Sequence, residues 1–240
     1  MYIHNSDICG RFYYEMASSE WFEVKVASQL TQDEIKECAE LFSSHYGVWG
    51  RNGRKPGEAV KMGATQLRSQ YLFDDRCFAV MAHHGTSLIG HALYRRFEYL
   101  DGYGVWVTQL VVHKDYRRRH VASKLLAIAI NDAPKLRVAG LASSHPAAVL
   151  ALERVMKSRC IPALCSALAP GVLACCGVPY LSSANHASLS NGKPVSIINT
   201  RFFVDHGEVD SIRESITGWK LGKLNDGEEF FVLLFTGMPT

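Results

Sequence analysis

The sequence predicts a single mixed α/β domain, and three observations support this fold class. About half of the 240 residues are hydrophobic and 20% are charged, which is typical of a globular protein with a core. Strand-like stretches alternate with stretches of helical periodicity. Neither a clear linker nor an internal repeat divides them. We therefore expect one domain over residues 21–240, after an N-terminal extension over residues 1–20.

The first third of the domain alternates strand and helix signals. Residues 21–30 (WFEVKVASQL) are rich in strand-forming residues. Thr31 is followed three residues later by a glutamate, the spacing of a capping box, which predicts a helix beginning there. A second helix is expected over residues 55–73, after a Pro-Gly start. Two strand signals come next, at residues 76–85 and 88–100.

The middle of the chain contains the clearest local pattern. An Asp-Gly turn signal at residues 101–104 predicts a hairpin. Residues 105–112 are nearly continuously apolar, as expected of a strand buried on both faces. Val121, Leu125 and Ile128 then line one side of a predicted helix. The remaining elements are expected as a strand at 135–144, a helix at 145–158 and strands at 194–204 and 228–237.

Composition excludes several kinds of protein. The net charge of +3 is too small to indicate a nucleic-acid partner. Seven cysteines without a C-x-x-C spacing predict reduced thiols rather than a disulfide framework or a metal site, although a nucleophilic cysteine stays open. The N-terminus lacks the basic and apolar segments of a secretory signal. We expect a cytoplasmic protein without a metal, a nucleic-acid partner or a membrane partner.

Residues 117–126 (RRRHVASKLL) place three arginines between the buried strand and the helix. A turn that enters a helix offers several backbone N–H donors in a small space, and the helix dipole favours an anion there. Arginine adds charge-assisted bonds to phosphate. The segment therefore suits a phosphate-bearing cofactor, and the alternative interpretation is a solvated basic turn.

This strand, turn and helix resemble the acyl-CoA-binding motif of the GCN5-related N-acetyltransferase (GNAT) superfamily, whose pattern is Arg/Gln-x-x-Gly-x-Gly/Ala. Residues 117–122 occupy the six places. The element order over residues 21–158 also fits, whereas residues 194–237 fit only by general shape. The resemblance implies a GNAT-like fold, with a mixed, mostly antiparallel central sheet, helices on both faces and an apolar insertion before the last strands.

The resemblance also implies acetyl-CoA as co-substrate. Family members leave a gap between two parallel strands, where the pantetheine arm pairs with the backbone. Here residues 142–144 would form one side, and the other side would be Leu110, Val111 and Val112. The pyrophosphate would lie on Arg117, Arg118, Arg119, His120, Val121, Ala122 and Ser123. His145 stands where the family usually has a cofactor-contacting asparagine, and its alternative role is to cap the helix.

Two positions depart from the family pattern. His120 occupies the place of the first glycine, so its side chain either points outward or weakens binding of the cofactor. Many relatives have a tyrosine that protonates the leaving thiolate at the position of Leu152. If a proton is needed in this chain, it must come from elsewhere or from water.

An amine acceptor must lose a proton before it attacks a thioester. Counting back through the hairpin places Glu98 roughly opposite Val107, which makes Glu98 the expected general base. The alternative is that Glu98 is an ordinary surface residue of a strand.

Residues 160–192 contain no Asp, Glu, Lys or Arg. The stretch is long enough to span a membrane, but its three prolines argue against a continuous spanning helix. We expect an insertion that packs against the core or in a homodimer interface. The alternative is that it forms one wall of an acceptor pocket.

Together these features predict an N-acyltransferase that moves an acetyl or other short acyl group from acyl-CoA to an amine by direct attack on the thioester. The acceptor would be a small-molecule or peptide amine. The alternative hypothesis is a catalytically weak or inactive GNAT-fold module for binding or interaction.

Overall fold

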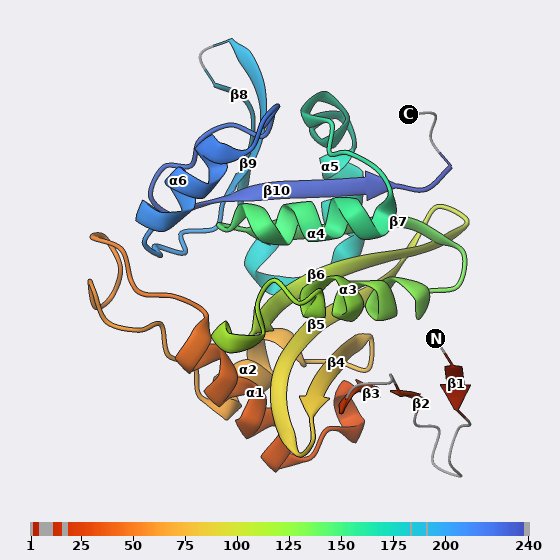
Figure 1. Ribbon diagram of the computed structural model, residues 1–240. Coiled ribbons are helices and arrows are strands. Elements are labelled where there is room, and N and C mark those ends of the chain that lie inside the picture. The colour runs from red at the N-terminus through yellow and green to blue at the C-terminus, as the bar shows by residue number, and fades with distance from the viewer. Residues whose placement is uncertain (1, 5–11, 16–18, 183, 191, 238–240) are drawn as a thin grey trace.

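The computed structural model describes residues 2–4, 12–15, 19–182, 184–190 and 192–237 (Figure 1). Within these residues, one sheet has the strand order β1-β2-β3-β4-β5-β6-β7-β10-β9-β8. The strands are β1 (Tyr2–His4), β2 (Phe12–Glu15), β3 (Glu20–Val26), β4 (Cys77–His84), β5 (Ser87–Tyr99), β6 (Gly102–Val112), β7 (Leu136–Ser143), β8 (Asn185–Ser190), β9 (Lys193–Asn199) and β10 (Glu228–Phe235). Only β6 and β7 pair in parallel, so the predicted mixed, mostly antiparallel sheet is confirmed.

Helices cover both faces of the sheet, as predicted. In β4, Val80 and Ala82 pack on the side of α3, whereas Ala79 and Met81 pack on the side of α1. In Figure 1, α3 and α4 lie in front of the sheet and α5 lies behind it. The helices are α1 (Gln32–His45), α2 (Ala64–Tyr71), α3 (Val121–Asn131), α4 (Pro146–Met156), α5 (Pro162–Cys176) and α6 (Gly207–Ser215), with the short 3-10 helices η1 (Ala27–Gln29), η2 (Lys114–Tyr116) and η3 (Pro179–Leu181).

The capping signal at Thr31 is confirmed. The Thr31 hydroxyl accepts a bond from the Glu34 backbone N–H, and the Glu34 carboxylate accepts one from the Thr31 N–H. The second helix, in contrast, begins at residue 64 and not at residue 55. Residues 55–63 form part of the connection between α1 and α2 instead, where Gly57 has a φ of +80°.

The two unusual segments of the sequence both join the sheet. In the N-terminal extension, β1 pairs with β2, and β2 pairs with β3; residues 1, 5–11 and 16–18 lie outside the described residues. In the insertion, α5 packs against β5, β6, β9 and β10. Among the described residues, no helix is both long and apolar enough to cross a membrane.

Six of the seven cysteines lie in the described part of the chain, and there they are free thiols; Cys9 lies outside it. The closest contact is between Cys160 and Cys165, whose sulfur atoms lie 3.3 Å apart under β10. No cluster of three or more His, Cys, Asp and Glu side chains that could hold a metal ion occurs among the described residues.

The feature that positions the site is a bulge in β6. Leu93 of β5 pairs with Gln109, but Tyr94 pairs with Val107, so Thr108 is an extra residue on β6. The Thr108 hydroxyl donates to the Leu93 carbonyl at 3.1 Å, which ties the bulge to β5. A bulge bends the strand that carries it. On its other side, β6 pairs with β7 as far as Val107 and Leu141, directly before the bulge. Beyond this pair the two strands diverge.

Close packing beside this divergence leaves no room for a side chain at Gly140, which can be tested by substitution. A Cβ added at Gly140 would lie 2.6 Å from the ring of Trp106, which is fully buried. Because the ring cannot move aside, we expect Gly140→Ala to lower the free energy of unfolding by about 1–3 kcal/mol, measured by urea denaturation. Gly171→Ala is the control, since nothing lies within 4 Å of that position in α5. The control should raise stability by about 0.5–1 kcal/mol, and equal effects would contradict the packing argument.

Candidate functional site

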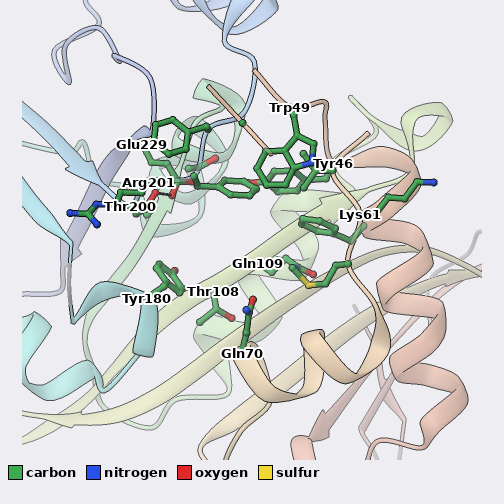
Figure 2. A pocket seen from close by; sticks show the side chains of 18 of the residues that line it. Tyr46, Trp49, Lys61, Gln70, Thr108, Gln109, Tyr180, Thr200, Arg201 and Glu229 are labelled. Atoms are coloured by element: carbon green, nitrogen blue, oxygen red, sulfur yellow. Dashed lines mark hydrogen bonds between the residues drawn. The ribbon is translucent and has the colours of Figure 1, made fainter. Parts of the chain in front are cut away.

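A cavity of about 760 Å³ lies where β6 and β7 diverge (Figure 2). Residues 107–110 of β6 and 141–143 of β7 line it. Tyr46 and Tyr71 enter from the α1 and α2 side, while Ala148 belongs to α4 on the opposite face. Because helices from both faces contribute to one cavity, it passes through the sheet between the two strands.

Glu229 is the buried acid of this cavity. It is the second residue of β10, and its side chain is only 6% exposed. Burial raises the pKa of its carboxyl to about 7, and a 2.7 Å hydrogen bond from the Thr200 hydroxyl opposes this effect. No basic side chain contributes to this pKa. A carboxyl of this kind exchanges a proton near neutral pH, as a general base must.

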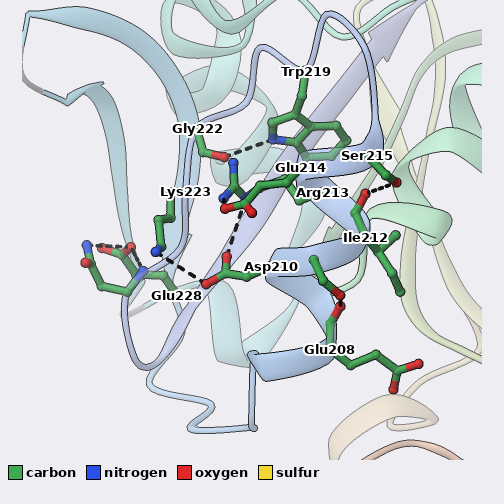
Figure 3. A network of polar contacts seen from close by, with 12 residues as sticks. Glu208, Asp210, Ile212, Arg213, Glu214, Ser215, Trp219, Gly222, Lys223 and Glu228 are labelled. Carbon is green, nitrogen blue, oxygen red and sulfur yellow. Dashed lines mark hydrogen bonds and ion pairs between the residues drawn. The ribbon is translucent and has the colours of Figure 1, made fainter.

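A surface network orders the segment that leads to Glu229 (Figure 3). Asp210 of α6 pairs with Arg213 and Lys223, each at 3.4 Å. The Glu228 carboxylate accepts a hydrogen bond from the backbone N–H of Asn225 at 2.7 Å, which fixes the turn before β10. Surface pairs contribute little stability one by one. The direction in which Glu229 points is set by the strand register, in which Glu229 pairs with Ile198 of β9.

Three tyrosines share the cavity with Glu229. Burial raises the pKa of Tyr71 to about 12 and the pKa values of Tyr46 and Tyr180 well above the usual value. All three are therefore protonated at neutral pH. The buried Trp106 indole donates to the Tyr180 hydroxyl oxygen at 2.9 Å, which leaves the tyrosine proton for donation. The Tyr46 hydroxyl lies near Ser144, directly after β7, and this proximity opposes the effect of burial on the Tyr46 pKa.

Gln109 presents its amide to the same cavity and is held from behind by His91. The His91 Nε2 atom lies 2.7 Å from the Gln109 carbonyl oxygen. Burial lowers the pKa of His91 to about 4, so the imidazole is neutral at physiological pH and donates through Nε2. The fixed amide nitrogen of Gln109 lies 3.8 Å from the sulfur of Met62.

The predicted pantetheine residues lie in different surroundings. Leu110 lines the cavity, and so do residues 142 and 143 across the gap. Val111 packs on the α1 side of the sheet, and Val112 packs on the α3 side. No residue of β6 beyond Val107 pairs with β7. The sheet edge on which a pantetheine arm would pair is therefore present.

The predicted pyrophosphate turn has the expected backbone. The N–H groups of residues 118–123 find no acceptor in the described part of the chain; the first helical bond runs from Lys124 to the His120 carbonyl at 3.0 Å. A cluster of N–H groups at a helix start fits a phosphate. The Arg117 side chain, however, bonds to the carbonyls of Val112 and His45, so it anchors the turn to β6 and α1. Arg119 lies over the Tyr116 ring, at 5.3 Å.

The backbone at His120 has a conformation that favours glycine. Its φ is +63°, in the left-handed region, and its side chain makes no capping bond to α3. The side chain is exposed. An L-residue in this conformation is strained by about 1–2 kcal/mol, whereas glycine is not. At this position the turn therefore has a backbone conformation that a glycine would adopt without strain.

His145 caps α4, as the alternative interpretation proposed. Its Nδ1 atom accepts a hydrogen bond from the Ala147 backbone N–H at 3.1 Å. Burial lowers the pKa of His145, and the positive charge of Arg117 adds to that effect. A neutral imidazole is required for this acceptor role. A contact between His145 and the cofactor stays a prediction.

The predicted position of Glu98 is wrong. Glu98 pairs with Tyr103, and the residue opposite Val107 is Tyr94. The hairpin turns tightly at residues 100–101, so the register differs by four residues from the expected one. Glu98 is exposed near the hairpin tip and does not line the cavity. The buried carboxyl that lines the cavity, Glu229, was not predicted, although two glutamates at the start of an apolar strand are a signal that one of them faces inward.

The family model described as the acetyltransferase (GNAT) family matches residues 25–155, more than half of the chain. The chain belongs to this family. The region that matches the GNAT model includes β6 with its bulge, the turn at residues 117–120, α3, β7 and most of α4. It does not include β10, so Glu229 lies outside the matched region.

Solved structures of GNAT type are similar at low identity. Arabidopsis thaliana NAA60 in complex with acetyl-CoA is 12% identical, with a TM-score of 0.48, covering 91% of this chain and 99% of that one. The ribosomal-protein-S18-alanine N-acetyltransferase from Escherichia coli is 12% identical, with a TM-score of 0.46, covering 91% and 96%. No curated protein matches. At these levels the neighbours carry no argument about substrate or partner, and a cytoplasmic location and a homodimer stay predictions.

The strain at His120 can be tested directly. We expect His120→Gly to raise the free energy of unfolding by about 0.5–1 kcal/mol, because relief of the left-handed strain exceeds the added freedom of the unfolded chain. Thermal or urea unfolding measures it. Arg119→Gly is the control, since Arg119 is not left-handed and should lose stability. If both variants lose stability equally, the conformational argument is wrong.

Burial of Glu229 predicts a pH dependence of stability. The ordinary pKa of a glutamate carboxyl is 4.5, and that of Glu229 in the folded chain is about 7, so folding favours the protonated form. Its contribution is fully present below pH 4.5, falls between pH 4.5 and 7, and is lost above pH 7. Relative to wild type, Glu229→Gln should gain about 3 kcal/mol of unfolding free energy from pH 4.5 to 8. Glu58→Gln, at an exposed site, should show no such change.

Proposed function

We propose that the chain transfers an acetyl or other short acyl group from acyl-CoA to an amine, with Glu229 as the general base. The observation that carries this proposal is a buried carboxyl, with a pKa of about 7, in a cavity at the point where β6 and β7 diverge. The thioester supplies the electrophilic carbonyl carbon, and the amine attacks it directly. Positioning and deprotonation are the two tasks that remain for the protein.

Acyl-CoA binding rests on backbone groups. The N–H groups of residues 118–123 would hold the pyrophosphate, with Arg118 and Arg119 adding positive charge. The edges of β6 and β7 beyond Val107 would hold the pantetheine arm, with Leu110 to Val112 on the β6 side. Because these contacts use the backbone, they tolerate the unusual histidine at position 120.

Deprotonation of the amine suits Glu229. In a cavity of low polarity an ammonium group is poorly solvated, and a carboxyl with a pKa near 7 accepts its proton readily. Tyr46 is the suitable donor to the leaving thiolate, because its hydroxyl lies beside Ser144 at the gap and is protonated. It would take the role that a tyrosine at position 152 has in many relatives; Leu152 itself is fully buried in the core.

The experiment combines binding with kinetics. Calorimetry should detect acetyl-CoA binding to the wild-type chain and to Glu229→Gln alike, and thiol release in the presence of amines should be slower in the variant. We expect kcat/KM to fall about 100-fold or more and the limb of the pH profile with an apparent pKa near 7 to disappear. Glu40→Gln, at an exposed position of α1 that does not line the cavity, is the control. Absence of acetyl-CoA binding at high micromolar concentration would refute the proposal.

The alternative, an inactive binding module, makes a different prediction in the same experiment. It requires acetyl-CoA binding without thiol release beyond the rate of the uncatalysed reaction. The raised pKa of Glu229 argues against it, because a purely structural position in a core is filled more stably by an apolar residue.

A further inference from the structure

We propose that the acceptor is a small primary amine with one positive charge and an aromatic body, bound in the cavity beneath a roof of two joined main-chain segments. This inference rests on the proposed acyl transfer. Three properties of the cavity carry it: the main-chain closure above it, the aromatic side chains around it and the single buried charge within it.

The roof consists of residues 48–59, between α1 and α2, and residues 203–205, after β9. Isolated bridges join Val48 to Ala59 and Trp49 to Val204. The Gly50 N–H donates to the Phe203 carbonyl at 2.9 Å. At Gly53 a Cβ would lie 2.8 Å from that same carbonyl oxygen, so the two segments touch along their backbones.

The joined segments cover one side of the cavity and restrict a polypeptide from lying across that side. Trp49 and Tyr46 lie on the side of the cavity opposite Thr108 and Gln109 (Figure 2). The two roof segments reach this place from different elements, and main-chain hydrogen bonds join them. An acceptor in the cavity lies beneath this roof, which suits a small molecule better than a side chain on a folded protein.

The walls are aromatic. Phe42 stacks on Tyr46 with ring centroids 4.4 Å apart, and Phe202 meets the edges of both Tyr46 and Trp49 at 5.6 Å. On the other side, the rings of Tyr71 and Tyr180 are 6.3 Å apart. Aromatic walls attract an aromatic ring through edge and face contacts, and their faces also attract an ammonium group.

The charge inside the cavity matches one amine. Glu229 is the one buried ionisable carboxyl among the described residues that line it. The other charged lining residues, Arg54, Lys55, Glu58, Lys61 and Arg201, are exposed at the rim. An acceptor with several ammonium groups would leave charges buried without a partner, which is costly. A monoamine leaves none.

The first arm of the test uses the wild-type chain and acetyl-CoA. Thiol release is measured with 2-phenylethylamine, tryptamine, propylamine, spermidine, kanamycin and a short peptide with a free N-terminus. We expect kcat/KM for the two aromatic amines to exceed that for each other acceptor at least tenfold. Higher values for spermidine, kanamycin or the peptide would overturn the acceptor class and leave the acyl transfer standing.

The second arm uses variants of the walls. Trp49→Ala and Phe202→Ala should lower the ratio of kcat/KM for tryptamine to that for propylamine about tenfold, mainly through KM. Trp49→Phe, which keeps an aromatic ring, should retain most of the ratio even if the alanine variant folds poorly. Leu100→Ala is the matched truncation of an apolar residue that is 80% exposed and far from the cavity in the hairpin turn, and it should leave the ratio unchanged.

Two further outcomes are decisive. An unchanged ratio in the folded alanine variants would overturn the role of the aromatic walls. Acetyl-CoA binding by calorimetry without thiol release to any amine would overturn both the acceptor class and the acyl transfer.

Discussion

In the strand register, Thr108 lies opposite no residue of β5, whereas Val107 and Gln109 on either side of it are both paired. This one extra residue bends β6. The parallel pairing of β6 with β7 ends at the residue just before it, Val107. The cavity, the unpaired strand edges and the approach from both faces all follow from this separation. A regular β6 would close the sheet and leave Glu229 and Tyr46 facing a continuous surface.

A second constraint is the burial of a carboxyl without a cation. Elsewhere in the molecule buried charges are paired: Glu23 and Lys25 lie 3.0 Å apart, and Arg95 bonds to Asp74. Glu229 instead has only the Thr200 hydroxyl, so its carboxyl stays near the balance between its two protonation states. Pairing stabilises a fold, whereas this arrangement sacrifices stability for a group that exchanges protons.

Sequence reasoning located the half of the site that depends on local signals. The apolar run of β6, the turn at residues 117–122 and the periodicity of α3 are contiguous, so they could be recognised together. Position across strands was harder. A hairpin expected as a four-residue loop turns in two residues, with Leu100 at a φ of +53°, and this moved Glu98 away from the divergence.

The half of the candidate site that would hold the acceptor could not be predicted from local sequence patterns. Three tyrosines and one glutamate line the cavity from separate elements: Tyr46 at the end of α1, Tyr71 of α2, Tyr180 of η3 and Glu229 of β10, which lies between β7 and β9. No spacing in the sequence encodes such a long-range arrangement. The uncharged insertion was expected either to pack on the core or to form a pocket wall, and through α5 and Tyr180 it does both.

The roof separates two functions that often depend on the same side chains. Its closure uses backbone groups of Gly50, Phe203 and Val204, whereas its lining uses the rings of Trp49 and Phe202. Substitution of a ring therefore leaves the closure intact. In evolution, the rings that line the roof can therefore change while the backbone contacts of the roof stay the same. Related chains can differ in acceptor without a change in how the two roof segments are joined.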